Sequence, residues 1–388
     1  MTGKLALVLS GGGARGAYEV GVLRWLARER PQFFEQTRIV SGSSVGAINA
    51  AYLASHGMSP SAVESLARIW SELTIDELIG FGARHLVGRI GRWRDRAVDG
   101  EIPGQGWLRT DGYEKLIYGS VDWPRLNETV REGKLDAIAI AATEVGSGRT
   151  HIFVSHHETV SKPVWPFDGS MIGLHTPLGP EHVLASASLP FLFSPVKIGG
   201  RWFCDGGLRQ NTPLSPALRL GADRLLAVSL KKTSTDDGTA THAFPGFSQL
   251  IGKLLNSLFL DRLLWDLDRL SRINTLLACI EHLHGEESVS LLQAELVKRG
   301  RRPYHHVDYV GVRPSADIGR IAATMLQPPH QLHTPLGFFM RRILGSGASG
   351  VSDAASYLLF DGAFASRLMD LGSQDAANCV SDIDRLLR

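Results

Sequence analysis

The chain has little cysteine, little net charge and no long apolar run, and each shortage excludes a class of protein. Its 388 residues include only three cysteines, Cys204, Cys279 and Cys379, which lie too far apart for metal-ligand spacing or a disulfide framework. A formal net charge of +2 gives no argument for nucleic acid as a partner. No window offers the ~18 uninterrupted apolar residues of a transmembrane helix. We therefore expect a soluble, cytoplasmic protein that is at most peripheral on a membrane.

What the chain does have is apolar sequence arranged in alternating strands and helices. Hydrophobic residues make up 44% of it, enough for a sizeable core. The near-continuous apolar run Lys4–Ser10 is typical of a central parallel strand, and Ala14–Glu29 has helical spacing. Ile39–Ser43 is expected to be a second strand, followed by an Ala-rich helix over Ser44–Ser55. This order predicts an α/β sheet with right-handed crossovers.

The later part of the chain predicts more strands and then a change of character. The expected strands are Leu135–Ala142, Thr150–Ser155, Pro195–Ile198, Arg201–Cys204, Arg224–Leu230 and Tyr304–Val312, with the first two and the next two paired as hairpins across glycine turns. The expected helices beyond a polar linker at Thr233–Gly246 are Phe247–His284, Ser315–Ala323, Gly337–Leu344 and Val351–Leu371. We predict a main α/β domain over residues 1–230 with a helical insertion at about 60–110. A mainly helical region over residues 247–388 would pack on it or extend it.

A serine lies in a tight turn between the second strand and its helix. Gly42-Ser43-Ser44-Val45-Gly46 matches G-x-S-x-G, in which a side chain at Gly42 or Gly46 would clash with the neighbouring strand or helix. The following helix would point its N–H groups at Ser44 and favour an alkoxide or oxyanion there. The alternative is an ordinary turn rich in small residues, with Ser44 as a helix N-cap.

The first strand ends in a glycine-rich loop that has two interpretations. Gly11, Gly13 and Gly16 satisfy G-x-G-x-x-G, which invites NADP binding and an oxidoreductase. An acidic residue should then end the second strand, but Ser41 stands there and Glu35 comes before the strand. An NADP site is therefore demoted but stays open.

The same loop also suits a transient negative charge. The N–H groups of Gly11, Gly12 and Gly13 could approach a tetrahedral oxyanion without Cβ obstruction, and each such donor lowers the barrier by about 3 kcal/mol. Arg15 could add a cation at the rim, anchor the loop, or lie solvated in the first helical turn. The sequence does not choose among these roles.

A serine nucleophile needs a base, and Asp205 is one candidate. It follows a short apolar strand and precedes Gly206 and Gly207, an arrangement that exposes a carboxylate at the edge of the sheet where ligands bind. A desolvated aspartate can accept a serine proton directly. Alternatively, Asp-Gly-Gly is a plain turn. A Ser–His–Asp arrangement would need a histidine, and the candidates are His182, His242, His282, His284, His305, His306, His330 and His333.

Together these elements resemble the patatin-like phospholipases. The resemblance rests on Gly11–Gly16, Gly42–Gly46 and Asp205–Gly207 in order, with the small-residue and proline segment Ala185–Pro190 before the aspartate. It covers roughly Lys4 to Leu218. It implies a three-layer α/β/α fold with a mainly parallel sheet, a Ser44–Asp205 dyad without a histidine, and an oxyanion hole from Gly12 and Gly13 with neighbouring Gly11 and Arg15.

The implied reaction is hydrolysis of an acyl ester, such as that of a glycerophospholipid, with no metal or cofactor. A catalytically silent lipid-binding protein of the same fold is an alternative.

Arg84–Arg96, with Trp93, could lie on anionic headgroups as a basic amphipathic helix, or form a solvated cap. Phe247–Leu283 is a second membrane candidate, or packs on the main domain or another subunit. Oligomeric state is left open.

Overall fold

The computed structural model describes residues 3–78, 111–160, 165, 169–190, 192–209, 211–232, 263–299, 303–326 and 355–388. Its strands are β1 (Leu5–Leu9), β2 (Thr37–Ser43), β3 (Ala137–Glu144), β4 (Thr150–His156), β5 (Met171–His175), β6 (Val196–Ile198), β7 (Arg201–Asp205), β8 (Arg224–Val228) and β9 (Asp308–Val312). They form one sheet in the order β5-β4-β3-β2-β1-β8-β9, with β7 pairing β3 and β6 off this path.

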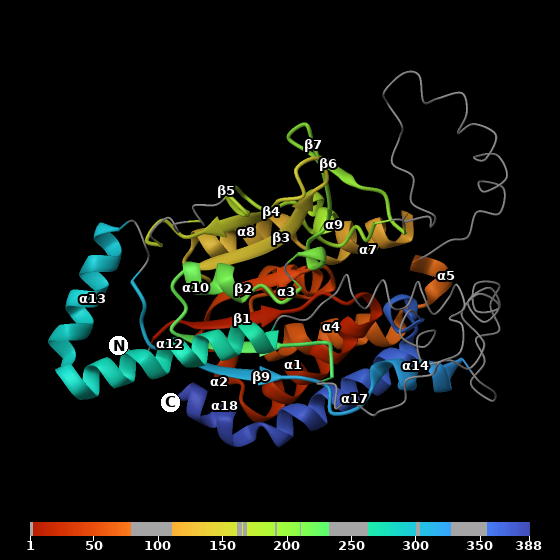
Figure 1. Cartoon of the computed structure of the whole chain (residues 1–388). Helices are drawn as coiled ribbons and strands as arrows, with labels where there is room; N and C mark the ends of the chain where they lie inside the picture. Colours follow the sequence, from red (N-terminus) through yellow and green to blue (C-terminus); the bar gives the residue numbers. More distant parts are fainter. Residues whose placement is uncertain are drawn as a thin grey trace, which may run out of the picture.

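Helices cover both faces of this sheet (Figure 1). In chain order they are α1 (Ala17–Glu29), α2 (Gln32–Gln36), α3 (Val45–Ser55), α4 (Pro60–Glu72), α5 (Ile75–Leu78), α7 (Asp111–Ser120), α8 (Trp123–Arg131), α9 (Pro180–Ser186), α10 (Leu214–Arg219), α12 (Leu263–His284), α13 (Glu286–Lys298), α14 (Ile318–Met325), α17 (Gly362–Asn378) and α18 (Val380–Leu387). Short 3₁₀ turns, η1 (Gly13–Gly16) and η2 (Gly206–Leu208), follow β1 and β7.

The apolar run of β1 is buried on both sides, as its sequence predicts. Leu5, Leu7 and Leu9 face the core that contains α1, α3, α4 and α17, while Ala6 and Val8 face the one that contains α10 and α12. Side chains alternate along a strand, so a central strand between two helical layers must be apolar throughout. The expected three-layer α/β/α fold is confirmed.

Parallel pairing predominates in the sheet and aligns the strand ends. β1 pairs parallel with β2 and β8, β2 with β3, and β8 with β9. The expected hairpins β3–β4 and β6–β7 are present, and β7 also runs antiparallel to β3. β7 pairs with Ala142–Glu144 of β3, directly beyond Ala141 where β2 ends at Ser43, so the ends of β2 and β7 meet and this edge carries the candidate site.

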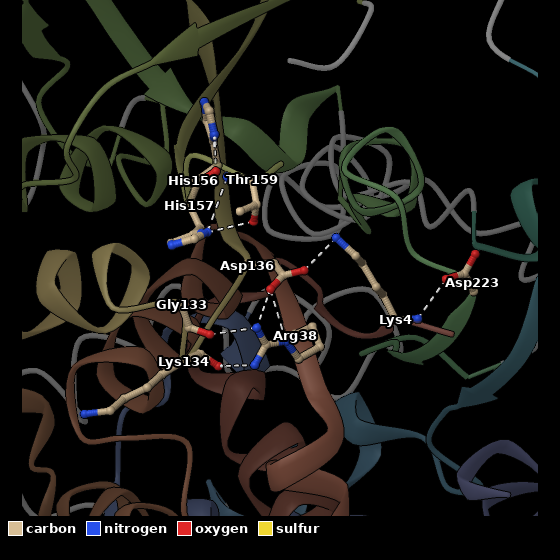
Figure 2. Close-up of polar contacts among 9 residues, drawn as sticks. All are labelled: Lys4, Arg38, Gly133, Lys134, Asp136, His156, His157, Thr159 and Asp223. Atoms are coloured by element: carbon tan, nitrogen blue, oxygen red, sulfur yellow. Dashed lines mark hydrogen bonds and ion pairs between the residues drawn. The ribbon is translucent and has the colours of Figure 1, made fainter. Parts of the chain in front are cut away.

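The opposite edge of the sheet is held by ion pairs, which Figure 2 shows. The Lys4 ammonium lies 2.6 Å from an Asp136 oxygen, and Arg38 binds the other oxygen of that carboxylate. The Lys4 backbone N–H donates to Asp223 at 2.7 Å. Burial acts to raise the pKa of Asp136, but the hydrogen bonds from Lys4 and Arg38 outweigh it and lower the pKa below its usual value. Charges thus tie together the amino ends of β1, β2, β3 and β8.

The C-terminal region is built into the same body. β9 extends the sheet beside β8, and α17 lies along α1. The crossing of these two helices is close: a Cβ on Gly21 would collide with the Met369 backbone, and one on Gly372 would collide with the Tyr18 carbonyl. The division into residues 1–230 and 247–388 stays a prediction.

Some expected elements differ from the structure or lie outside the described residues. The single helix predicted over Val351–Leu371 is interrupted, because Asp361 accepts the N–H groups of Ala363 and Phe364 and caps a new helix, α17. β5 and α8 are not predicted by the pattern. Arg84–Arg96, the linker Thr233–Gly246 and Gly337–Leu344 lie outside the described part of the chain.

Candidate active site

Ser44 occupies a strained turn between β2 and α3. Its backbone has φ 52° and ψ −126°, a region that side-chain-bearing residues rarely adopt. The turn is tight because a Cβ on Gly42 would come within 2.5 Å of the Gly46 carbonyl oxygen, and one on Gly46 within 2.5 Å of the Leu9 oxygen. This is the close packing that the sequence predicts. The strain lifts the Ser44 hydroxyl above the carboxyl edge of the sheet.

Asp205 lies at the end of β7 and meets Ser44 there. The Ser44 hydroxyl donates to Asp205 Oδ2 at 2.6 Å, and the Gly207 N–H donates to Asp205 Oδ1 at 2.7 Å. The register of β3 and β7 places Asp205 opposite Ala142, and Gly206 packs so tightly on the Ala141 carbonyl that no Cβ would fit. Two residues 161 positions apart are thus brought into direct contact by the pairing of β7 with β3.

The environment of the Asp205 carboxyl changes its acidity. The side chain is fully buried, and this desolvation raises its pKa from the usual 3.8 to about 7, although the hydrogen bonds from Ser44 and Gly207 act to lower it. A carboxyl with a pKa near 7 holds a proton more strongly than an ordinary aspartate. It is therefore suited to accept a proton from a hydroxyl near neutral pH.

Ser186 holds the strained backbone of Ser44 in place. The Ser44 N–H donates to Ser186 Oγ at 2.9 Å, and the Ser186 hydroxyl donates to the Ala141 carbonyl at 2.6 Å. Ser186 is the last residue of α9 and is completely buried. The small-residue segment Ala185–Pro190 is part of the family resemblance, but the sequence does not reveal the role of Ser186, because its partner lies 142 positions away.

The candidate oxyanion residues do not lie equivalently around Ser44. Gly13 (φ 56°) lines the same cavity as Ser44 and Asp205. The Gly11 N–H donates to the Asn211 carbonyl at 2.9 Å, so this amide is already engaged and is not available to an oxyanion. Gly12 lies against Leu230: a Cβ on Gly12 would come within 2.7 Å of the Leu230 side chain. Gly13 is thus the residue of the loop best placed beside Ser44.

Arg15 and Gly16 have packing roles in the structure. Arg15 is buried at 4% exposure, its Nε donates to Ser356 Oγ at 2.8 Å, and its guanidinium lies 4.0 Å from the centre of the Tyr357 ring. It therefore anchors the C-terminal chain rather than lying solvated in the first turn. Gly16 has no room for a Cβ because Val45 of α3 packs on it.

A buried polar network lies behind the glycine loop. Glu19 on α1 accepts the Ser10 N–H at 2.6 Å and an Asn49 side-chain N–H at 2.9 Å, and the Trp70 indole donates to Asn49 at 3.1 Å. Burial raises the pKa of Glu19 to about 8, against the effect of these hydrogen bonds. Because Asn49 lies on α3, the network joins the loop before Gly11 to the helix that follows Ser44. In the sequence, the sign of this network is the lone asparagine, Asn49, in the Ala-rich helix.

The cavity at Ser44 is small and largely apolar. Its volume is about 20 Å³, and its walls are Gly13, Ser44, Tyr113, Ala187, Leu189, Phe193, Asp205, Tyr357, Leu358 and Phe360. No histidine is among them. Burial of Tyr113 and the nearby Asp205 charge raise the pKa of the phenol above its usual value, so its hydroxyl stays protonated.

The histidines considered as alternative bases that the structure describes lie away from this cavity. His182 accepts the Gly179 N–H at 2.9 Å at the start of α9, and His305 contacts the Ala222 carbonyl at 3.1 Å near the amino edge of the sheet. His282 and His284 are exposed at the end of α12. His306 flanks β9 at the amino edge of the sheet, away from the cavity. His242, His330 and His333 lie outside the described residues.

Over the described ranges, no group of three or more His, Cys, Asp or Glu side chains is arranged to hold a metal ion. In the same part of the chain, no helix combines the length and apolarity that a bilayer crossing requires.

Comparison with known proteins gives one family and several distant structures. VipD from Legionella pneumophila matches at 14% identity over 95% of this chain and 67% of its own, with a TM-score of 0.33. Human GIVD cytosolic phospholipase A2 matches at 12% identity with a TM-score of 0.43. The whole of this chain spans 60% of the human one. ExoU from Pseudomonas aeruginosa matches at 17% identity over 91% of this chain and 74% of its own, with a TM-score of 0.30.

The sequence model of the patatin-like phospholipases matches residues 7–218, more than half of the chain. This range contains the glycine loop, the Ser44 turn, Ser186 and Asp205, all of which meet at one edge of the sheet. The chain belongs to the patatin-like phospholipase family.

Proposed function

We propose that this protein is a serine lipid acyl hydrolase that cleaves acyl esters through a Ser44–Asp205 dyad. The observation that carries the proposal is the 2.6 Å hydrogen bond from the Ser44 hydroxyl to Asp205 Oδ2 in a cavity whose described walls contain no histidine. Family membership supports a lipid ester as the substrate. The likeness to solved phospholipases is too distant to carry a part of this argument.

The first half of the reaction forms an acyl-enzyme. Ser44 Oγ attacks the ester carbonyl carbon while its proton passes to Asp205 Oδ2, and the carbonyl oxygen becomes an oxyanion. Asp205 then gives this proton to the leaving alcohol as the bond between the acyl carbon and the alcohol oxygen breaks. Because the Gly207 N–H keeps hold of the other carboxyl oxygen, Asp205 stays oriented throughout.

The second half of the reaction releases the acid. A water molecule loses a proton to Asp205 and attacks the acyl carbon, and the proton returns to Ser44 Oγ as the acyl-enzyme bond breaks. The turn geometry serves both halves, because Ser186 fixes the backbone that presents Ser44.

The Gly13 amide is the first donor we assign to the oxyanion. Gly13 begins the η1 turn, and the first N–H groups of a helix have no preceding carbonyl within the helix to accept them. The N-terminus of α3 begins directly after Ser44 and adds its positive dipole end. We assign the Gly12 amide as the second donor to the oxyanion. Gly11 instead holds the shape of the loop, because its N–H donates to the Asn211 carbonyl.

Hydrolysis of p-nitrophenyl butyrate and of phosphatidylcholine vesicles tests the proposal. Ser44→Ala and Asp205→Asn are expected to lose about 10³-fold or more of kcat. Ser43→Ala is the matched control for the serine, because the Ser43 hydroxyl is buried without a partner among the described residues. Asp268→Asn, on the exposed side of α12, is the control for the aspartate. Full turnover by either dyad variant would contradict the proposal.

A further inference from the structure

Part of the wall of the Ser44 cavity comes from the C-terminal chain. Tyr357, Leu358 and Phe360 line the same cavity as Ser44 and Asp205, although the family match ends at residue 218. The site is therefore incomplete without residues 355–360. The contacts that hold this segment in place therefore determine which acyl groups the cavity accommodates.

Close backbone contacts at Tyr357 and at Gly362 hold residues 355–360 in place. A Cβ on Gly13 would collide with the Tyr357 carbonyl, and one on Gly362 would collide with the Ser71 carbonyl. The Gly362 N–H also donates to the Leu73 carbonyl at 2.9 Å. The segment thus lies directly on the glycine loop at Tyr357, and the chain just beyond it lies on the end of α4 at Gly362. It leads into α17, which is packed along α1 (Figure 1).

Arg15 contacts this segment at Ser356 and Tyr357 and holds it in place. Its Nε donates to Ser356 Oγ at 2.8 Å, and its guanidinium lies 4.0 Å from the centre of the Tyr357 ring. Arg15 and Ser356 are both buried, so these contacts act with little screening by water. One side chain of the glycine loop thereby sets the position of a wall that lies more than 300 positions later in the sequence.

The wall is aromatic and leaves little room. Phe360 stacks on Trp70 with ring centres 6.2 Å apart and lies 6.4 Å from Tyr113, which in turn stacks on Phe193 at 5.5 Å. An apolar pocket of this kind accepts the acyl part of an ester, because a polar group would lose its hydrogen bonds to water there. The volume of about 20 Å³ gives room for about one water molecule, since roughly 10–15 Å³ of such space is enough to hold one. An acyl group that exceeds this space must displace the surrounding side chains, so a longer chain fits less well.

We propose that residues 355–360 form the acyl-selecting wall of the active site. Leu358 and Phe360 set which acyl group fits, and Arg15 is the positioning residue that holds them against the glycine loop. The substrate class that follows is esters with a short acyl chain. This inference rests on the proposed Ser44–Asp205 chemistry and adds the basis of its selectivity.

The first test measures kcat/KM for p-nitrophenyl butyrate, octanoate and palmitate. The wild type is expected to prefer butyrate, and Phe360→Ala and Leu358→Ala to raise the octanoate-to-butyrate ratio by about tenfold or more. Phe360→Leu is a milder variant that keeps the core filled, and it should shift the ratio in the same direction. Leu368→Val is the matched control, since Leu368 is buried on α17 outside this segment.

A retained butyrate preference in folded Phe360→Ala and Leu358→Ala would overturn the wall assignment. Labelling by a small fluorophosphonate separates this result from failure of the dyad. If labelling depends on Ser44 but the chain-length ratio does not change, the wall is wrong and the dyad stands. If labelling does not depend on Ser44, the proposed function itself has failed.

The second test separates positioning by Arg15 from a direct role at the oxyanion. Ser356→Ala removes the Arg15–Ser356 hydrogen bond, and Arg15→Lys removes the planar guanidinium that also lies over Tyr357; both are expected to raise the octanoate-to-butyrate ratio and KM. The fluorophosphonate labelling rate should stay within about threefold of the wild type, as expected when transition-state contacts are kept. An equal fall in kcat for every ester in Arg15→Lys, with KM unchanged, would overturn the positioning role.

Discussion

Replacing Asp205 by asparagine is expected to stabilise the fold while abolishing turnover. The carboxyl is fully buried, and its pKa of about 7 lies about three units above the usual 3.8. Each unit corresponds to 1.36 kcal/mol, so ionised Asp205 lowers the free energy of unfolding by about 4 kcal/mol. Asparagine has nearly the same shape. Its oxygen can still accept the Gly207 N–H, and its amide can donate to Ser44.

The sign of this effect follows from the raised pKa. Below about pH 4 the carboxyl is neutral in both the folded and the unfolded chain, so Asp205 and asparagine should be equally stable there. As the pH rises toward 7, the Asp205 carboxyl ionises first in the unfolded chain, so the free energy of unfolding falls. The advantage of Asp205→Asn should therefore grow between pH 4 and 7 and stay constant above that.

Urea unfolding followed by tryptophan fluorescence at pH 4, 6 and 8 checks this expectation. Glu19 is also buried with a raised pKa, but it is present in both proteins, and its contribution cancels in the difference. The reasoning is refuted if the difference between the two proteins does not depend on pH, or if Asp205→Asn is the less stable one at pH 8.

Four further predictions concern the machinery around the dyad. Burst labelling by a fluorophosphonate should rise with pH and level off above about pH 7, because Asp205 must be ionised to take the proton; a rate that falls over this range would contradict it. Gly13→Ala should lose most activity, because φ 56° and the neighbouring carbonyl exclude a Cβ; kcat close to wild type would be the opposing result. Ser186→Ala frees the strained backbone of the nucleophile, so kcat should fall by about tenfold or more, with KM little changed in steady-state assays. Asn49→Ala leaves the Trp70 indole N–H buried without its partner and should lower the free energy of unfolding by about 1–3 kcal/mol in urea titrations.

Local pattern was enough to predict most of the sheet and the edge that carries the candidate site. The buried run of β1 and the tight turn around Ser44 follow from rules about apolar strands and small residues, and both are found as expected. Two hairpins were also predicted by their glycine turns. β5 was not predicted, because its sequence Met171–His175 has no strong strand pattern and its partner β4 supplies the pairing.

The rest of the site depends on contacts between distant parts of the chain. Gly11 was expected among the oxyanion donors, but its N–H is engaged by Asn211, a contact that spacing does not reveal. The position of Arg15 was left open, and its partners Ser356 and Tyr357 come from beyond the region that carries the motifs. Such contacts are set by tertiary packing, which a single sequence does not encode in a readable local pattern.

The most direct measurement of the central claim is mass spectrometry of the protein after reaction with a lipid-like fluorophosphonate. We expect a single phosphonyl adduct on the Ser44 hydroxyl, formed by the wild type, absent from Ser44→Ala and strongly slowed in Asp205→Asn. An adduct on another serine, or equal labelling of Asp205→Asn and the wild type, would contradict activation of Ser44 by Asp205.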